Sequence, residues 1–452
     1  PLDIAPPLFA KRYAPFYENV LQKELDSKVQ LDALRGRSAV VRTGFSKELQ
    51  LCGEEAISKG LAETEKQYPR LSGKGEKALQ AGLVSLDPVS GLIRAWVGGR
   101  DYGENQYDHV VQAKRPVGST IKPFIYITAI DPDLNSYRAA TPRSILPDEP
   151  ITVKLPNGSR WTPSNADRKF RGPVTLRYAL EHSLNLPPIH VTRRVGIDAV
   201  QRTLKRFQVH PSPPKVLALA LGALETDLLS LTAGYGAIAN GGRYTPPKLF
   251  ERIEDPRGDI LFEPRYQELQ VADPGAAFII SDILRGVVAR GTGKLAQTDP
   301  PLKFAAGKTG TSQDARDAWF VGFTERLVTG VWVGFDDNRP VRLGGGSAAA
   351  PIWRRYMECS APYIDQEVPI PPRNVVRVAL DGATGDLYSE NCPENNKVYE
   401  LFLRGTEPVR ACALHGGVIS SEKSVTREAD GRPRREPYEK NRKNFFERLF
   451  GL

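Results

Sequence analysis

Three apolar, strand-like segments joined by short connections most constrain how this 452-residue chain can fold. They occupy residues 303–312, 318–323 and 327–335. Such short connections can join only antiparallel neighbours, because parallel strands need a crossover of a dozen or more residues. Two more strands are predicted over residues 83–86 and 92–97, around the turn sequence DPVSG. We therefore expect an antiparallel five-stranded sheet formed by segments from both ends of one domain.

A set of helices is predicted between the early hairpin and the later strands. Apolar residues recur at helical spacing over residues 119–130, 174–207, 217–239 and 276–290. The third of these segments ends at an asparagine-glycine-glycine run, which suits a left-handed helix stop. Because helices and strands lie in separate blocks, we expect a mixed α/β fold of the α+β type, with helices flanking the sheet and a helical subdomain inserted.

Composition divides the chain into four predicted regions. Residues 1–75 are polar and helix-prone and are interpreted as a linker region. Residues 76–362 hold the predicted main domain, and residues 363–418 a small β-type subdomain after a proline-rich break. Residues 419–452 form a charged tail with little apolar content before its end, and we expect it to be disordered.

The apolar stretches, such as residues 216–224, are far shorter than the ~20 residues that cross a bilayer. The chain begins at Pro1 without a methionine, and no secretory signal heads it. We therefore expect a processed or excised piece whose anchor, if any, has been removed.

Charge and cysteine spacing narrow the classes of ligand. The net charge of +9 suits an anionic membrane surface or a polyanionic wall polymer. The basic residues do not form one stripe with interleaved aromatic residues, so nucleic acid is not an expected partner. The chain contains neither a CxxC nor an HExxH pattern, and we expect no metal and no cofactor.

The chain has four cysteines. Cys392 and Cys412 bracket a short, loop-like segment and could form a disulfide, which would indicate an oxidising compartment. The alternative is that both are free thiols.

A serine and a lysine three residues apart stand at the start of a predicted helix. In Ser119-Thr120-Ile121-Lys122, positions i and i+3 lie on one helical face, which brings the amine within reach of the hydroxyl. Pro123 fits only if the helix begins near Ser119, because the first turn needs no backbone donor there. By itself the pattern is weak, since Ser-x-x-Lys occurs twice more in the chain.

Two further segments strengthen this interpretation. Ser183 and Asn185 follow a helical stretch and precede two prolines, so their side chains are expected in a loop. Lys308 begins the Lys-Thr-Gly run of a predicted strand. A phosphate-binding loop is excluded there, because Leu302 stands where that motif needs glycine. Ser-x-x-Lys, Ser-x-Asn and Lys-Thr-Gly in this order are the motifs of penicillin-recognising serine acyl-transferases.

The chemistry assigns a role to each of these side chains. Ser119 is the expected nucleophile, and its hydroxyl needs a base to take its proton. Lys122 can be that base if burial and a nearby cation, Lys308, lower its pKa. Ser183 can relay a proton to the leaving amine, and Asn185 can hydrogen-bond Lys122 and a substrate amide.

The strand residues are expected to hold the substrate. Lys308 with the hydroxyls of Thr309 and Thr311 can bind a terminal carboxylate. Gly310 can let a substrate backbone lie along the strand. The backbone amides of Ser119 and Thr311 are the predicted oxyanion hole.

In these motifs and in their order, the chain resembles the transpeptidase part of class A, bifunctional penicillin-binding proteins over about residues 80–415. Residues 1–75 resemble the linker that follows the glycosyltransferase domain in that family. Further matching stretches are RPVGS before Lys122, RGPVTLR at 171–177, AWFVGF at 318–323, and GTEP at 405–408 with Cys412.

This resemblance implies the penicillin-recognising serine transpeptidase fold and D-Ala-D-Ala transpeptidation of peptidoglycan stem peptides through an acyl-enzyme on Ser119. It also implies acylation by β-lactams and a location on the outer face of a bacterial cytoplasmic membrane. The membrane-anchored glycosyltransferase portion would be a further part of the same polypeptide, and no such sequence is present here.

Three other functions remain open from the sequence. A β-lactamase of class A has Ser-Asp-Asn where this chain has Ser183-Leu184-Asn185. A D,D-carboxypeptidase differs only in passing the acyl group to water, which sequence separates poorly. A catalytically silent β-lactam sensor or scaffold is disfavoured by the intact Lys122 and Lys308.

Overall fold

The computed structural model describes residues 13–28, 39–135, 140–154 and 158–415. These residues divide into two compact units at Pro372 and Arg373. The predicted tail at residues 419–452 lies outside the described residues. None of the described helices is both long enough and apolar enough to pass through a bilayer.

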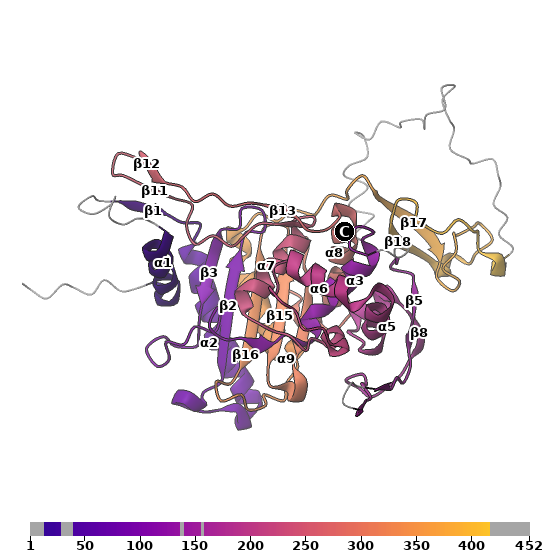
Figure 1. Ribbon diagram of the computed structural model, residues 1–452, viewed down its shortest axis with the longest axis horizontal. Coiled ribbons are helices and arrows are strands. Elements are labelled where there is room, and N and C mark those ends of the chain that lie inside the picture. Colours follow the sequence, from indigo (N-terminus) through magenta and orange to yellow (C-terminus); the bar gives the residue numbers. More distant parts are fainter. Residues whose placement is uncertain (1–12, 29–38, 136–139, 155–157, 416–452) are drawn as a thin grey trace, which may run out of the picture. The chain divides into compact units, whose positions relative to one another are not determined.

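A five-stranded antiparallel sheet forms the centre of the first unit, as the sequence predicts (Figure 1). Every residue of β15 and β16 is buried, which explains why these strands are almost wholly apolar. The sheet joins the early hairpin to the late strands, so residues about 240 positions apart pair side by side. The strands, in spatial order, are β14 (Ala306–Thr311), β15 (Ala318–Phe323), β16 (Val328–Gly334), β2 (Gln80–Leu86) and β3 (Ile93–Val97).

Two long helices cover one face of this sheet. They are α2 (Lys47–Gln67) and α9 (Gly345–Ser360), which pack on each other and on the strands. Alternate strand residues such as Leu83, Phe320 and Val331 belong to the same buried cluster as Trp353 of α9. The sequence analysis did not predict α9, although its apolar residues at 348, 349, 352, 353, 356 and 357 follow helical spacing.

Helices from the inserted region pack on the sheet and on each other. The predicted helical stretch at 174–207 is three helices, and the break between the first two contains Ser183 and Asn185. The helix that ends at the predicted asparagine-glycine-glycine stop is α7, and Gly241 and Gly242 there have positive φ. The helices are α3 (Lys122–Ile130), α4 (Leu176–Glu181), α5 (Leu186–Val195), α6 (Ile197–Arg206), α7 (Leu228–Ala239) and α8 (Pro274–Ala289).

Several short elements complete the first unit. A helix, α1, spans Pro15–Lys28. A small sheet pairs β1 (Val40–Arg42), β11 (Arg252–Glu254) and β12 (Ile260–Phe262). Two-stranded pairs are formed by β4 (Arg115–Pro116) with β9 (Glu225–Thr226), β5 (Ile145–Asp148) with β8 (Gly172–Thr175), β6 (Val153–Lys154) with β7 (Arg160–Trp161), and β10 (Arg243–Tyr244) with β13 (Leu269–Gln270).

The second unit contains one two-stranded antiparallel sheet in its described part. It consists of β17 (Val375–Asp381) and β18 (Lys397–Leu403), joined through the 3₁₀ turn η9 (Glu394–Asn396). A final 3₁₀ turn, η10, spans Ala413–His415.

The predicted linker region contributes to the main core. Helix α2 lies within residues 1–75, and its residues Leu49, Ile57 and Leu61 are buried in the cluster beneath the sheet. Ser46 caps this helix by accepting a hydrogen bond from the amide of Leu49 at 3.2 Å. The packed unit therefore begins well before residue 76.

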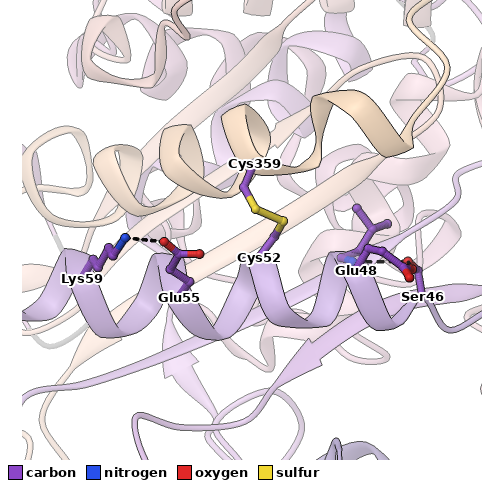
Figure 2. The surroundings of a disulfide bond; sticks show 7 residues. Ser46, Glu48, Cys52, Glu55, Lys59 and Cys359 are labelled. Carbon is purple, nitrogen blue, oxygen red and sulfur yellow. Dashed lines mark hydrogen bonds and ion pairs between the residues drawn. A yellow bond between two sulfur atoms is a disulfide. The ribbon is translucent and has the colours of Figure 1, made fainter.

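The predicted disulfide is wrong. The structure bonds Cys52 of α2 to Cys359 of α9, with their Cα atoms 5.6 Å apart (Figure 2). Cys392 and Cys412 are buried free thiols in the second unit. Closeness in sequence suggested the wrong pair, because a pair separated by 307 residues becomes adjacent only when α2 and α9 pack together.

We predict that the Cys52→Ala/Cys359→Ala double variant keeps the fold but loses about 2–5 kcal/mol of stability, since the cross-link restricts the unfolded chain. Thermal or urea unfolding measures the difference. Reductant should lower the wild-type midpoint to that of the double variant and leave the variant unchanged. Equal midpoints for the oxidised wild type and the variant would contradict this.

Candidate active site

Ser119 lies in a 3₁₀ turn that leads directly into helix α3. The turn, η4, spans Gly118–Ile121, and α3 begins at Lys122 with Pro123 in its first turn. Ser119 is half-buried, whereas its neighbours Gly118 and Thr120 are buried. The serine therefore stands at the mouth of a helix, where the amide end of the helix dipole is positive.

Gly118 brings this turn against the edge strand of the sheet. Its φ is +53°, and a Cβ atom there would lie 2.2 Å from the carbonyl oxygen of Thr311. Only glycine fits such an approach and such a backbone conformation. The peptide before Ser119 thus packs on the peptide of Thr311, which places the two predicted oxyanion-hole residues on adjoining segments.

Lys122 is wholly buried beneath the turn. Its Nζ donates to the carbonyl oxygen of Ser183 at 2.7 Å and to Oδ1 of Asn185 at 2.7 Å. Burial and the charge of Lys308 hold the pKa of Lys122 well below that of a free lysine, although the charge of Asp148 acts in the opposite direction. Lys122 is thereby suited to carry a neutral amine.

Ser183 sits between the two lysines, in the break between α4 and α5. Its Oγ accepts from Nζ of Lys308 at 2.8 Å and lies 3.4 Å from Nζ of Lys122. Its φ of +56° is uncommon for a residue other than glycine, and such strain is characteristic of functional sites.

Asn185 is held by a chain of polar groups that leads inward to the buried Asn165 and Asp148. Its amide N–H donates to Oδ1 of Asn165 at 2.7 Å, and its Nδ2 donates to the carbonyl of Ser164 at 2.8 Å. The side-chain amide of Asn165 in turn donates to both carboxylate oxygens of Asp148, at 2.8 and 3.0 Å. These bonds leave Oδ1 of Asn185 directed at Lys122.

Lys308 is wholly buried on strand β14. Its Nζ donates to Ser183 and to the carbonyl of Thr309 at 3.0 Å. Burial lowers the pKa of Lys308 to about 7. Two lysines therefore share the hydroxyl of Ser183, and the pKa of each lies below that of a free lysine.

Strand β14 is an edge of the five-stranded sheet, so its outer side is a place for an extended chain to add. Oγ1 of Thr309 lies 2.7 Å from Oγ1 of Thr292, and Oγ1 of Thr311 accepts from the amide of Gly345 at 3.2 Å. Packing within the domain also requires glycine at position 310, because a Cβ there would lie 2.6 Å from Cγ2 of Thr120 and 2.7 Å from the carbonyl of Val117.

The segments meet at one cleft of about 690 Å³. Of the predicted residues, Ser119, Ser183, Asn185, Thr309 and Thr311 line it. The two lysines lie behind this surface. Lining residues that sequence reasoning did not assign include Trp161, His182, Gly222, Thr292 and Gly344–Gly346.

Two of these additions had a signal in the sequence. Thr292 stands between two glycines, and residues 344–346 are three consecutive glycines at the start of α9. Clustered glycines indicate loops, and without side chains such loops can approach a neighbouring backbone closely. A Cβ on Gly345 would lie 2.4 Å from the carbonyl of Gly310.

Comparison with known families agrees with this geometry. Residues 81–358 match the family model described as the penicillin-binding protein transpeptidase domain. The chain belongs to this family. Residues 371–417 match a second model, the C-terminal domain of penicillin-binding protein 1A. The resemblance and the fold class predicted from the sequence are both confirmed.

Individual relatives of the transpeptidase family cover the same region. Penicillin-binding protein 1B of Vibrio cholerae is 36% identical over 302 residues, which are 66% of this chain and 38% of the relative. Penicillin-binding protein 1A of Neisseria gonorrhoeae is 38% identical over 320 residues, 68% of this chain and 39% of the relative. The chain thus spans about two fifths of the length of these curated relatives.

A solved structure shows the same fold. The crystal structure of penicillin-binding protein 1A from Haemophilus influenzae aligns with a TM-score of 0.77 at 23% identity. The alignment covers 88% of this chain and 77% of that chain.

We predict that Gly118→Ala destabilises the transpeptidase domain by more than about 2 kcal/mol, because it adds a clash to the cost of positive φ. Gly241→Ala is the matched control, since Gly241 has a φ of +59° and nothing within 4 Å of its Cβ position. It should cost only about 1–2 kcal/mol. Urea unfolding of both variants checks this, and equal losses would exclude a close contact between Gly118 and Thr311.

Proposed function

We propose that this chain is a peptidoglycan D,D-transpeptidase that cross-links stem peptides through an acyl-enzyme on Ser119 and is acylated by β-lactams. The observation that carries the proposal is the convergence of Lys122 and Lys308 on Ser183 beside the Ser119 turn. Family membership supports the same reaction class.

The acylation step uses Lys122 as base, because its pKa lies well below that of a free lysine. Neutral Lys122 takes the proton of Ser119 Oγ, and the oxygen attacks the carbonyl between two D-alanine residues. Backbone amides of Ser119 and Thr311 stabilise the negative charge on the carbonyl oxygen of the tetrahedral intermediate. The C–N bond then breaks, and Ser183 relays the proton held by Lys122 to the departing D-alanine amine, which leaves Lys122 neutral again.

Substrate binding is assigned to the edge strand. The ammonium of Lys308, with the hydroxyls of Thr309 and Thr311, binds the terminal carboxylate of the donor peptide. The donor backbone adds beside β14 in extended form. Deacylation follows when the amine of a second stem peptide attacks the ester and Lys122 accepts its proton. The bond between the acyl carbon and Ser119 Oγ then breaks, and Lys122 returns the proton to that oxygen.

The same site accounts for a lasting β-lactam adduct. A β-lactam is an amide whose leaving nitrogen stays attached to the acyl group, so it remains in the cleft after ring opening and obstructs the acceptor. The adduct therefore persists where a peptide acyl group is transferred onward.

We further propose that the chain acts on the outer face of a bacterial cytoplasmic membrane, as the portion of a longer polypeptide that also carries an anchored glycosyltransferase. The Cys52–Cys359 disulfide supports an oxidising compartment. The greater length of the relatives supports further segments in the whole protein.

We predict that Ser119→Ala abolishes labelling by a reporter-tagged penicillin, because it removes only the attacking oxygen. Ser212→Ala is the matched control, since Ser212 heads a second Ser-x-x-Lys run at an exposed position. It should label like the wild type. Peptide mapping by mass spectrometry locates the adduct, and an adduct on any residue other than 119 removes Ser119 from this role.

We predict that Lys122→Ala slows acylation by about 10²- to 10⁴-fold, the contribution of a general base. Lys215→Ala, from the second Ser-x-x-Lys run, should leave the rate unchanged. In the wild type the acylation rate should fall at acid pH as Lys122 gains a proton. It should also fall above pH 7 as Lys308, with a pKa of about 7, loses its positive charge.

Stopped-flow measurement of the acylation rate as a function of pH tests both the fall at acid pH and the fall above pH 7. A Lys122→Ala rate within a few-fold of the wild type would show that another base acts.

A stem-peptide assay distinguishes the alternatives that share this site. Release of D-alanine with formation of a cross-linked product supports a transpeptidase. Release without cross-links, even with an added acceptor amine, indicates a carboxypeptidase. Rapid turnover of the penicillin indicates a β-lactamase, and a stable adduct with no peptide reaction indicates a sensor.

A further inference from the structure

The second unit is small for an independently folded domain. Its described residues, 373–415, include only one two-stranded sheet. Domains of about 40 residues usually need a disulfide, a metal or oligomerisation, because they bury too little apolar surface. The buried residues here include both free cysteines of the chain.

Four side chains of metal-ligand type converge in this unit. They are Asp381, Cys392, Cys412 and His415, and one ligand atom from each lies within 4.8 Å of all the others. Asp381 ends β17, Cys392 precedes η9, and His415 ends η10. Cys412 follows Ala411, which bridges to Leu387. Cys412 and His415 are three residues apart in sequence, and the fold brings Asp381 and Cys392 to them.

The two carboxylate oxygens of Asp381 have different surroundings. Backbone amides bind Oδ1, whereas Oδ2 faces the other ligand-type side chains. Oδ1 accepts from the amides of Ala383 at 2.8 Å and Thr384 at 3.1 Å. Oδ2 is buried and lies 2.9 Å from Nδ1 of His415, and the thiol of Cys392 also faces this carboxylate. Neither neighbour gives Oδ2 a hydrogen bond of acceptable geometry among the described residues. A wholly buried carboxylate oxygen without a hydrogen bond is costly unless a cation is bound beside it.

The sulfur atoms are arranged around the same point. Sγ of Cys412 lies 3.2 Å from Nδ1 of His415, so that ring nitrogen faces both a sulfur and a carboxylate oxygen. One ring proton cannot serve both acceptors well. Sγ of Cys392 accepts from the amide of Ser389 at 3.4 Å and lies 3.3 Å from its hydroxyl, contacts that would orient a thiolate ligand.

We propose that the second unit binds one Zn²⁺ ion through the two cysteine sulfurs, Nδ1 of His415 and Oδ2 of Asp381. Two thiolates, an imidazole and a carboxylate suit tetrahedral zinc, and a full set of four protein ligands indicates a structural site. Zinc bond lengths place such ligand atoms about 3.3–3.8 Å apart. The two contacts at Nδ1 of His415, 2.9 and 3.2 Å, would therefore lengthen slightly, and the longest separations, at most 4.8 Å, would contract. Both thiols release their protons on binding.

The proposed site revises the expectation that the chain holds no metal. That expectation rested on the lack of CxxC spacing, whereas Cys392 and Cys412 are brought together by tertiary structure. The ion would link Asp381 at the end of β17 to His415 at the end of η10. It would thereby cross-link segments near the beginning and the end of the described part of this unit.

The experiment uses the full 452-residue chain, made metal-free under reducing conditions and then supplied with one equivalent of zinc sulfate. Native mass spectrometry and elemental analysis should find one zinc per chain. The thiols of Cys392 and Cys412 should resist alkylation until a chelator is added. Cobalt(II) in place of zinc should give the absorption of a tetrahedral, thiolate-bound ion.

Variants test the ligand set. Asp381→Asn should weaken zinc binding because it removes an anionic ligand, and Cys392→Ser should abolish stoichiometric binding because it removes a thiolate. Asp386→Asn is the matched control in the same unit and should bind zinc like the wild type. If a ligand variant fails to fold, the alkylation and cobalt measurements on the wild type still decide the question.

Two results would overturn the proposal. One is a reduced chain that binds no zinc while both thiols react freely. The other is a Cys392–Cys412 disulfide that forms and persists when zinc is present. Penicillin labelling at Ser119 is followed in the same samples, so failure of the zinc site is distinct from failure of the proposed transpeptidase.

Discussion

The burial of two lysines against one serine hydroxyl is the interaction on which the proposed chemistry depends. Lys122 and Lys308 are both withdrawn from water, and both have Nζ within 3.4 Å of Ser183 Oγ. Desolvation disfavours the charged form of each amine, and the charge of Lys308 further lowers the pKa of Lys122. One lysine can then act as a base while its neighbour holds an anion, although the two residues are chemically identical.

The rest of the domain keeps this arrangement in place. Strand β14 positions Lys308, the start of α3 positions Lys122, and the break between α4 and α5 positions Ser183. The close approach of Gly118 to Thr311 joins the first two of these segments. Behind the sheet, α2 and α9 fill the core and are joined by a disulfide (Figure 2). A site made of distant segments needs such a rigid support, since small displacements are costly to catalysis.

Features that depend only on residues close together in sequence were predicted correctly. Apolar strand-like segments and short connections predicted the sheet, and Pro123 correctly placed the start of a helix near Ser119. Sequence reasoning failed where pairing depends on distant contacts. The bond between Cys52 and Cys359 requires α2 to pack on α9, a helix that was not predicted. For the same reason a region interpreted as a linker proved to supply part of the core.

The order of residues along the chain specifies which chemical groups are available and on what kind of local element each one lies. These properties follow from backbone preferences and from hydrophobic spacing, which act over a few residues. Only the tertiary structure decided which groups meet. It brought Asn165 and Asp148 beneath Asn185, turned Thr292 toward Thr309, and gathered four ligand-type side chains in the second unit. Such encounters depend on how whole helices and strands pack, and no short stretch of sequence encodes that packing.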